Sequence, residues 1–226
     1  MTDHLSLAQK INIMRASVMG ANDGILSVAG IVIGVAGATS NNFAIFISGI
    51  AGMLAGTISM AMGEYVSVST QKDAQEIAVI NTQLNLASNY DSQLAFVRQK
   101  YIKTGIAPEL AAKASTEMMS ADAVTTVVRE KYGFDPTAYT NPYAAAVASL
   151  ISFPIGSILP LLAIILLPSH FKIIGTIIAV MIALSITGYT AAVLGNANRP
   201  KAILRNVISG LITMLVTYAI GSLFAH

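Results

Sequence analysis

The sequence contains no cysteine and no tryptophan, and only 11% of its 226 residues are charged. The lack of cysteine excludes disulfide bonds and thiolate metal sites. Because a soluble domain is about one-quarter charged, the scarcity of charge together with 54% hydrophobic residues excludes an ordinary soluble protein. Without tryptophan, any aromatic belt at a membrane surface must use tyrosine and phenylalanine. The composition predicts an all-α, polytopic membrane protein.

Five apolar segments are long enough to cross a bilayer, since a membrane helix needs roughly 20 apolar residues. They are residues 16–38, 43–66, 143–167, 173–194 and 203–224. The first six residues belong to a short amphipathic lead-in that precedes the first span. We therefore expect three parts: residues 1–70 with the lead-in and two spans, 71–141 with a small polar subdomain, and 142–226 with three spans.

The polar segment 71–141 predicts three helices rather than strands. The first continues the second span and ends near Ser88 and Asn89. The second covers about 91–104, and Gly105 ends it. The third opens with Pro108 in its first turn and reaches Lys131, with a break expected near Ser120.

The distribution of lysine and arginine predicts the orientation in the membrane. If the N-terminus is cytoplasmic, two basic residues of the lead-in, seven of the polar segment and three after the fourth span face the cytoplasm, and only Lys172 lies outside. We expect a cytoplasmic N-terminus and polar subdomain and an outside C-terminus. The N-terminus lacks the pattern of a signal peptide, and the lack of a targeting extension favours a bacterial plasma membrane over a vacuole.

Asp23 is a carboxylate inside the first predicted span. A carboxylate in hydrocarbon costs at least a few kcal/mol, so such a residue is expected to face protein or water and to be functional. The alternative is that Asp23 only hydrogen-bonds Asn22 or a serine to fix helix packing. We favour function, because a neutral residue could fix packing at a lower cost.

Met60 lies at nearly the same depth as Asp23 if the first two spans form a hairpin that turns near Ser40. The position level with Asp23 is near Ile58, so Met60 is about 3 Å away along the axis and Glu64 about 9 Å away towards the cytoplasm. A carboxylate combined with a thioether suits a borderline transition metal. Glu64 is either a metal ligand at the cytoplasmic mouth or an interfacial carboxylate in contact with water.

The polar segment offers a second group of candidate metal ligands, Glu117, Met118, Met119 and Asp122. The alternative for most of these residues is a solvated helix surface. Met53 and Met62 are expected to fill space in a span, which is the usual role of methionine. The three histidines, His4, His170 and His226, are expected to be incidental.

Pairs of glycines recur at a spacing of four residues, which lets membrane helices approach closely. The pairs are Gly20 with Gly24, Gly30 with Gly34, and Gly52 with Gly56. Packing within one chain and packing along a dimer seam both remain open for these pairs.

The first three spans also carry recognisable motifs: ANDGILSVAGIVIGVAGA, GTISMAMGEYVSVSTQKD and NPYAAAVASLISFPIGSILPLL. They resemble the vacuolar iron transporter family, and the similarity covers essentially the whole chain. The resemblance implies a five-span fold, a homodimer with the pathway along its two-fold axis, and proton-coupled movement of ferrous iron or manganese out of the cytosol. It places the intramembrane aspartate of the family on Asp23 and its second-span methionine on Met60.

Two features depart from the family pattern. Plant relatives carry a further glutamate two turns before the methionine, where this chain has Gly52. Members with a metal-collecting cytoplasmic domain place glutamates along its first helix, whereas residues 77–90 contain no acid here. We therefore expect the polar subdomain to be a weak antechamber for metal or a scaffold.

The sequence as a whole predicts a plasma-membrane transporter that exports ferrous iron or manganese by proton antiport, for metal homeostasis and detoxification. We expect no enzyme activity and no cofactor, with the metal as transported substrate. The expected partners are a second copy of the chain, divalent metal ions, protons and the lipid bilayer, with no nucleic acid. The alternatives are a structural or channel-like dimeric membrane protein and a membrane-bound iron oxidase, although the chain lacks the His and Glu ligand set of di-iron bundles.

Overall fold

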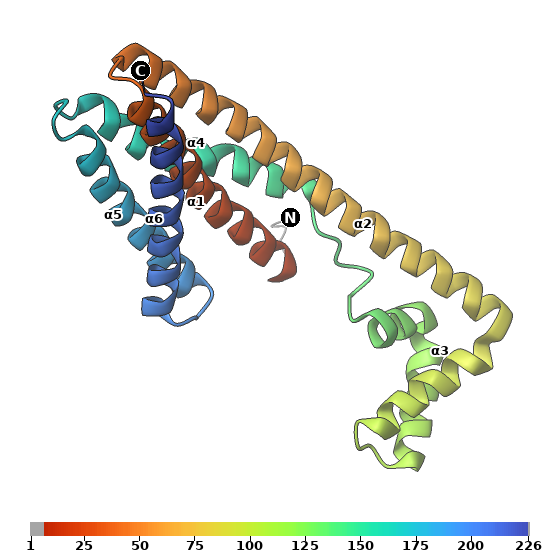
Figure 1. The fold of residues 1–226 in the computed structure, drawn as a ribbon. Coiled ribbons are helices and arrows are strands. Elements are labelled where there is room, and N and C mark those ends of the chain that lie inside the picture. The colour runs from red at the N-terminus through yellow and green to blue at the C-terminus, as the bar shows by residue number, and fades with distance from the viewer. Residues whose placement is uncertain (1–6, 226) are drawn as a thin grey trace, which may run out of the picture. The chain divides into compact units, whose positions relative to one another are not determined.

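The computed structural model describes residues 7–225, which form six helices and, within that range, no strand (Figure 1). The helices are α1 (Leu7–Ala38), α2 (Asn42–Lys103), α3 (Pro108–Tyr132), α4 (Pro142–Leu166), α5 (Lys172–Leu194) and α6 (Arg199–Leu223). The described residues fall into two compact units. We call residues 10–66 and 142–225 the membrane unit, and residues 7–9 and 67–141 the polar unit.

Five helices of the described chain are long and apolar enough to cross a membrane, namely α1, α2, α4, α5 and α6. The predicted all-α fold with five spans is therefore confirmed. Asparagine side chains begin two of these helices. Asn41 Oδ1 accepts the backbone N–H of Phe43 at 2.9 Å, and Asn198 Oδ1 accepts that of Lys201 at 3.1 Å. Each bond satisfies an N–H group that has no partner within its helix.

The predicted lead-in and the first span form one helix, because α1 begins at Leu7. The part of the lead-in formed by residues 1–6 lies outside the described residues. α2 passes from the membrane unit into the polar unit at residues 66–67.

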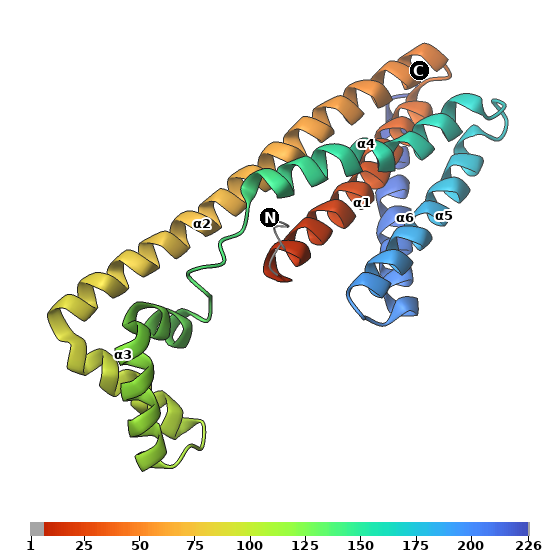
Figure 2. The same ribbon diagram turned by 180° about the vertical axis from the view of Figure 1, so that it is seen from behind.

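The membrane unit is held together by close approaches between its helices, and the two views show α1 beside α4 and α6 (Figure 1 and Figure 2). A Cβ atom added at Gly24 would lie 3.0 Å from the carbonyl carbon of Phe153 on α4. One added at Gly34 would lie 3.2 Å from the carbonyl oxygen of Thr217 on α6. Only glycine allows backbones to come this close.

All three glycine pairs of the sequence contact another helix of the same chain. Gly20 and Gly24 meet α4, Gly30 and Gly34 meet α6, Gly52 meets Ile31 on α1, and Gly56 meets Phe153 on α4. Packing within the chain is therefore confirmed as a role of these spacings. The helices enclose an apolar cluster to which all five spans contribute, including Val28, Ile45, Phe153, Leu184 and Met214.

The two ends of the membrane unit differ in charge. The turns after α1 and α4 lie at one end, where the Lys172 ammonium donates a hydrogen bond to Asn42 Oδ1. Lys172 is the only basic residue of the unit near this end. The five others lie at or towards the opposite end: Lys10, Arg15, Arg199, Lys201 and Arg205.

The polar unit has a small apolar core of its own, formed by Val97, Met119 and Val127. The helical backbone of α2 is interrupted at Asn89, where φ is −146° and ψ is 56°. This position agrees with the helix end expected at residues 88–89. The interruption allows the two helical segments of α2 on either side of Asn89 to follow different directions.

A second interruption divides α3 at Asp122, two residues beyond the break expected at Ser120. Gly133 then ends α3 with a left-handed backbone, φ 76°. Its N–H group donates to the Arg129 carbonyl at 3.0 Å, which is the usual way a glycine closes a helix.

Candidate metal site

Asp23 lies midway along α1, in the part of the helix that packs against α4. The Ser149 hydroxyl donates to the Ala16 carbonyl at 3.3 Å, and the Ser157 hydroxyl donates to the Gly24 carbonyl at 3.2 Å. Both serines are completely buried. Because these bonds join the two helices on either side of Asp23, they fix its depth in the membrane unit.

The Asp23 carboxylate is only partly satisfied within the described chain. Its Oδ1 atom accepts the hydroxyl of Ser27, one turn further along α1, at 3.0 Å. That bond stays within α1, so it does not join two helices. The preceding residue, Asn22, has a buried Oδ1 atom with no hydrogen-bond partner among the described residues. A buried amide oxygen without a partner is costly unless a hydrogen-bond donor or a cation meets it. Carboxylate and amide oxygens are ligands that suit a divalent cation.

The methionines of α2 point in different directions. Met53 and Met60 are partly buried and pack against the apolar cluster of the membrane unit, whereas the Met62 side chain is 55% exposed. The thioether of Met60 is therefore on the side of α2 that faces the other helices. Whether Asp23 and Met60 bind one ion together stays a prediction.

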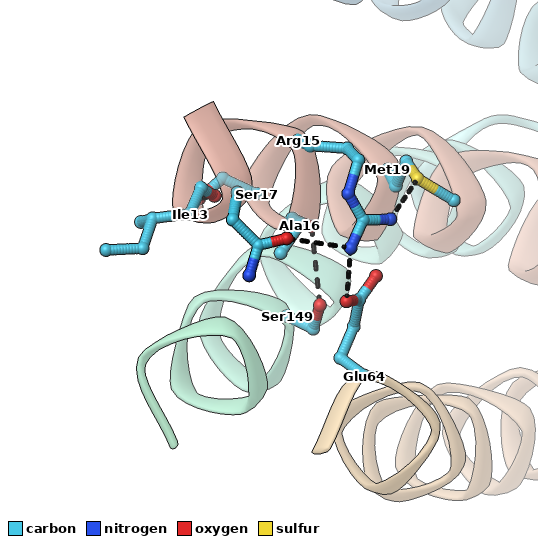
Figure 3. A network of polar contacts seen from close by, with 8 residues as sticks. Ile13, Arg15, Ala16, Ser17, Met19, Glu64 and Ser149 are labelled. Carbon is cyan, nitrogen blue, oxygen red and sulfur yellow. Dashed lines mark hydrogen bonds and ion pairs between the residues drawn. The ribbon is translucent and has the colours of Figure 1, made fainter. Parts of the chain in front are cut away.

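Glu64 is a buried carboxylate that forms an ion pair across two helices (Figure 3). Only 7% of the residue is exposed, and its Oε2 atom lies 2.8 Å from Nη2 of Arg15 on α1. The same guanidinium lies 3.1 Å from Asn12 Oδ1 and 3.3 Å from Met19 Sδ. Glu64 is thus enclosed by protein, unlike the water-facing carboxylate that the sequence left open as an alternative.

Sequence reasoning named Glu64 but missed its partner Arg15, and it also missed Asn12 and Met19, which contact that arginine. Asn12, Arg15 and Met19 are three and four residues apart, which places them on one face of a helix. That spacing was the available signal. The pairing of Arg15 with Glu64 spans 49 residues of sequence, so no local pattern could reveal it.

The candidates in the polar unit have separate environments. Glu117 is exposed and lies 4.0 Å from Lys113. The sulfur of Met118 lies 3.2 Å from the hydroxyl oxygen of Tyr101. Met119 is 2% exposed and belongs to the apolar core. The structure gives Met119 a packing role, and a shared metal site for this group stays a prediction.

Asp122, the fourth candidate, begins the second half of α3. Its Oδ1 atom accepts the backbone N–H of Thr125 at 2.9 Å, as a helix N-cap does. Hydrogen bonds from the Thr125 hydroxyl and amide lower the pKa of Asp122. Asp135 is held similarly by Thr137 and by Arg129, and these bonds lower its pKa to about 2. Both carboxylates therefore stay charged at neutral pH.

A tyrosine bridges the two helices of the polar unit. The Tyr101 hydroxyl donates to Glu130 Oε1 at 3.0 Å, and the Lys100 ammonium lies 3.0 Å from Glu130 Oε2. Burial and the neighbouring Glu130 carboxylate raise the pKa of Tyr101 to about 12. Glu130 is thus engaged in structural contacts.

No group of three or more His, Cys, Asp or Glu side chains lies close enough to hold a metal within residues 7–225. His170 lies in the turn after α4, and the other two histidines, His4 and His226, lie outside the described residues.

A family model described as the VIT family matches residues 14–222. The chain is 32% identical over 211 residues to a protein of Acanthamoeba castellanii named vacuolar iron transporter, covering 93% of this chain and 78% of that protein. It is 34% identical over 214 residues to vacuolar iron transporter homolog 2 of Oryza sativa subsp. japonica, covering 94% and 90%. It is 30% identical over 220 residues to vacuolar iron transporter homolog 2.1 of Arabidopsis thaliana, covering 96% and 84%. These matches span nearly the whole chain, and the protein is therefore a member of the VIT family, a family of transporters rather than enzymes.

Proposed function

We propose that this integral membrane protein transports ferrous iron through a site that contains Asp23 and Met60. The observation that carries the proposal is the Asp23 carboxylate, which lies in a helix of membrane-spanning length and accepts a hydrogen bond from Ser27 alone among the described residues. A bound cation would offset the cost of placing this charge in an apolar environment. The relatives named vacuolar iron transporters support iron as the cargo.

The donor types support ferrous iron over manganese as the preferred metal. Manganese favours sites made of oxygen alone, whereas a thioether shifts preference towards iron and later metals. Met60 supplies a thioether on the inward side of α2, and Asp23 supplies oxygen. Manganese is proposed as a second, weaker substrate.

Export from the cytosol is the proposed direction, and the charge of the two ends supports the orientation that goes with it. Five of the six basic residues of the membrane unit lie at or towards one end, and Lys172 lies at the other. Such an excess of Lys and Arg favours the cytoplasmic side, so α1 would begin in the cytoplasm and α6 would end outside. The proposal places the chain in the plasma membrane, and fractionation of cell membranes tests that location.

Proton antiport completes the proposed cycle. After one metal ion has left and before the next one binds, Asp23 would be an unpaired carboxylate in the apolar interior. A counter-transported proton would remove that cost. Metal uptake into everted membrane vesicles should therefore depend on a pH gradient. Uptake at the same rate with and without the gradient would exclude antiport.

A homodimer is the proposed assembly. Small residues at four-residue spacing are exposed along the first half of α2: Ala51, Ala55, Ser59 and Gly63. Such a stripe allows close contact between membrane helices. Light scattering of the protein in detergent should give twice the mass of one chain, and a monomer mass would refute the dimer.

Ferrous iron flux into proteoliposomes tests the proposed function. We expect the natural chain to transport iron and both Asp23→Asn and Met60→Leu to reduce flux at least tenfold, which corresponds to about 1.4 kcal/mol. Met60→Leu should impair iron more than manganese, because it removes only the sulfur.

Two matched controls separate loss of the site from general damage. Met62→Leu changes an exposed methionine of the same helix, and Asp73→Asn removes an exposed carboxylate of the polar unit. Both should retain flux. Full iron flux in Asp23→Asn, or equal loss in the controls, would contradict the proposal.

A further inference from the structure

The Arg15 guanidinium is surrounded by three donor atoms of the kinds that bind metals (Figure 3). Its Nη2 atom lies 2.8 Å from Glu64 Oε2 and 3.1 Å from Asn12 Oδ1, and its Nη1 atom lies 3.3 Å from Met19 Sδ. These are one carboxylate oxygen, one amide oxygen and one thioether. A borderline divalent metal accepts the same combination. The guanidinium therefore lies where a metal ion could bridge α1 and α2.

The two members of the ion pair differ in their freedom to move. The Glu64 side chain is 8% exposed, whereas that of Arg15 is 43% exposed. A charged carboxylate that is buried is costly without a positive partner. An arginine has a long flexible stem and keeps much of its hydration when it moves. A metal ion that binds the Glu64 carboxylate would therefore take the place of Arg15.

The fold also offers the guanidinium a second location. A hollow of about 230 Å³ borders Arg15 and Met19 and extends to Leu194 and Gly195 at the end of α5. The last turn of α5 contains no basic residue. Backbone N–H groups of residues 195–197 already bond to three of the last carbonyls of α5. The negative end of the helix dipole still favours a nearby cation, such as a guanidinium that has left Glu64.

We propose that Asn12, Met19 and Glu64 form a loading site for a divalent metal, and that Arg15 is a built-in cation which holds this site until the metal displaces it. The inference rests on the proposed transport function. Glu64 follows Met60 by four residues, one helical turn or about 6 Å, so an ion held there is one step from the deeper site. Exchange of one cation for another keeps Glu64 paired throughout.

This exchange sets the apparent affinity of the loading site. Apparent affinity falls in proportion to the fraction of molecules in which the site is free. If Arg15 occupies Glu64 in about nine of ten molecules, the metal binds about tenfold more weakly than it would without Arg15. A weakened site releases its ion readily, which suits passage rather than storage.

Two measurements on the full-length protein test the exchange: KM and Vmax of ferrous iron flux in proteoliposomes, and the Kd for Mn²⁺ at equilibrium in detergent. In Arg15→Gln we expect the KM and the Kd to fall about tenfold and Vmax to fall, because release now leaves Glu64 unpaired. Arg15→Lys should restore values close to those of the natural chain. In a Glu64→Gln background, Arg15→Gln should leave the Kd unchanged.

The thioether is tested with a matched pair of methionines. Met19→Leu should raise the KM for ferrous iron several-fold and leave that for manganese nearly unchanged. Met62→Leu is the control, since Met62 is also exposed but lies outside the proposed site. Neither change removes a buried side chain, so both variants should fold.

An unchanged or higher Kd in folded Arg15→Gln would overturn the exchange, because the ion pair would then only join α1 to α2. If Arg15→Gln does not fold, two other variants decide, Asn12→Leu by its Kd for Mn²⁺ and Met19→Leu by its KM for ferrous iron. Values equal to those of Met62→Leu overturn the loading site. Absence of iron flux in the natural chain would refute the proposed function alone, since the Mn²⁺ Kd is measured without transport. Iron flux in the natural chain, together with an Mn²⁺ Kd that does not change in Arg15→Gln, would refute the loading site alone.

Discussion

The contact between α1 and α4 gives a sharp quantitative prediction. A Cβ atom added at Gly156 of α4 would lie 2.9 Å from the carbonyl carbon of Ala21 and 3.0 Å from its Cα atom. The same Cβ atom would meet the carbonyl oxygen of Ala21 more closely still. Since non-bonded heavy atoms prefer a separation of about 3.5–4.0 Å, Gly156→Ala must move the two helices apart by about 1 Å or more. All these neighbours are backbone atoms, so no side chain can rotate to make room.

The expected cost follows from known effects of overpacking. Inserting a methyl group into a well-packed core costs about 1–3 kcal/mol, and the better helix propensity of alanine returns up to about 1 kcal/mol. Gly156→Ala should therefore destabilise the protein by about 1–2 kcal/mol. For a chain of this length, each kcal/mol lowers Tm by about 2–4 °C.

Gly63 provides the matched control. A Cβ atom at this position would have no atom of the same chain within 4 Å, and alanine already occupies two other positions of the exposed stripe, Ala51 and Ala55. Gly63→Ala should therefore leave Tm unchanged or raise it slightly. Because the chain has neither tryptophan nor cysteine, melting is best followed by far-ultraviolet circular dichroism. A Tm for Gly156→Ala equal to or above that of Gly63→Ala would refute the argument from close backbone contact.

The remaining predictions concern the polar unit. Asp122→Ala should destabilise it by about 1 kcal/mol, the usual cost of a lost N-cap. Asp122→Asn retains a capping oxygen for Thr125, so its Tm should be close to that of the natural chain. Equal Tm values for the two variants would contradict the capping role. Hydrogen bonds lower the pKa of Asp135 from 3.8 to about 2. The contribution of Asp135 to stability is therefore fully present above pH 3.8 and is lost as the pH falls towards 2. An NMR titration of the Asp135 carboxyl with a midpoint near 3.8 would contradict this.

The spans could be predicted from the sequence because the length of an apolar run is a local property. The start of α2 after Asn41 and the interruption at Asn89 also depend on neighbouring residues, and both lie where local reasoning placed them. Met119 illustrates the limit. Which of the adjacent residues Met118 and Met119 faces the apolar core depends on how α3 packs against α2, and no local sequence pattern encodes that packing.

The candidate site was less accessible to sequence reasoning than the fold. The cost of a carboxylate in an apolar segment identifies Asp23 from one residue and its surroundings. The Arg15–Glu64 pair depends instead on how α1 packs against α2, which the sequence does not encode locally. Glu64 was consequently named without the arginine that pairs with it.

The central claim is that Asp23 and Met60 meet at one ion. Since the chain has no cysteine, a double variant with Asp23→Cys and Met60→Cys carries only the two thiols of interest. Bound Cd²⁺ should protect both thiols from a maleimide mass tag, within one chain or between two. In the same experiment with Asp23→Cys and Met62→Cys, the thiol at residue 62 should be fully labelled. Full labelling of the Asp23 and Met60 pair in the presence of Cd²⁺ would contradict the account.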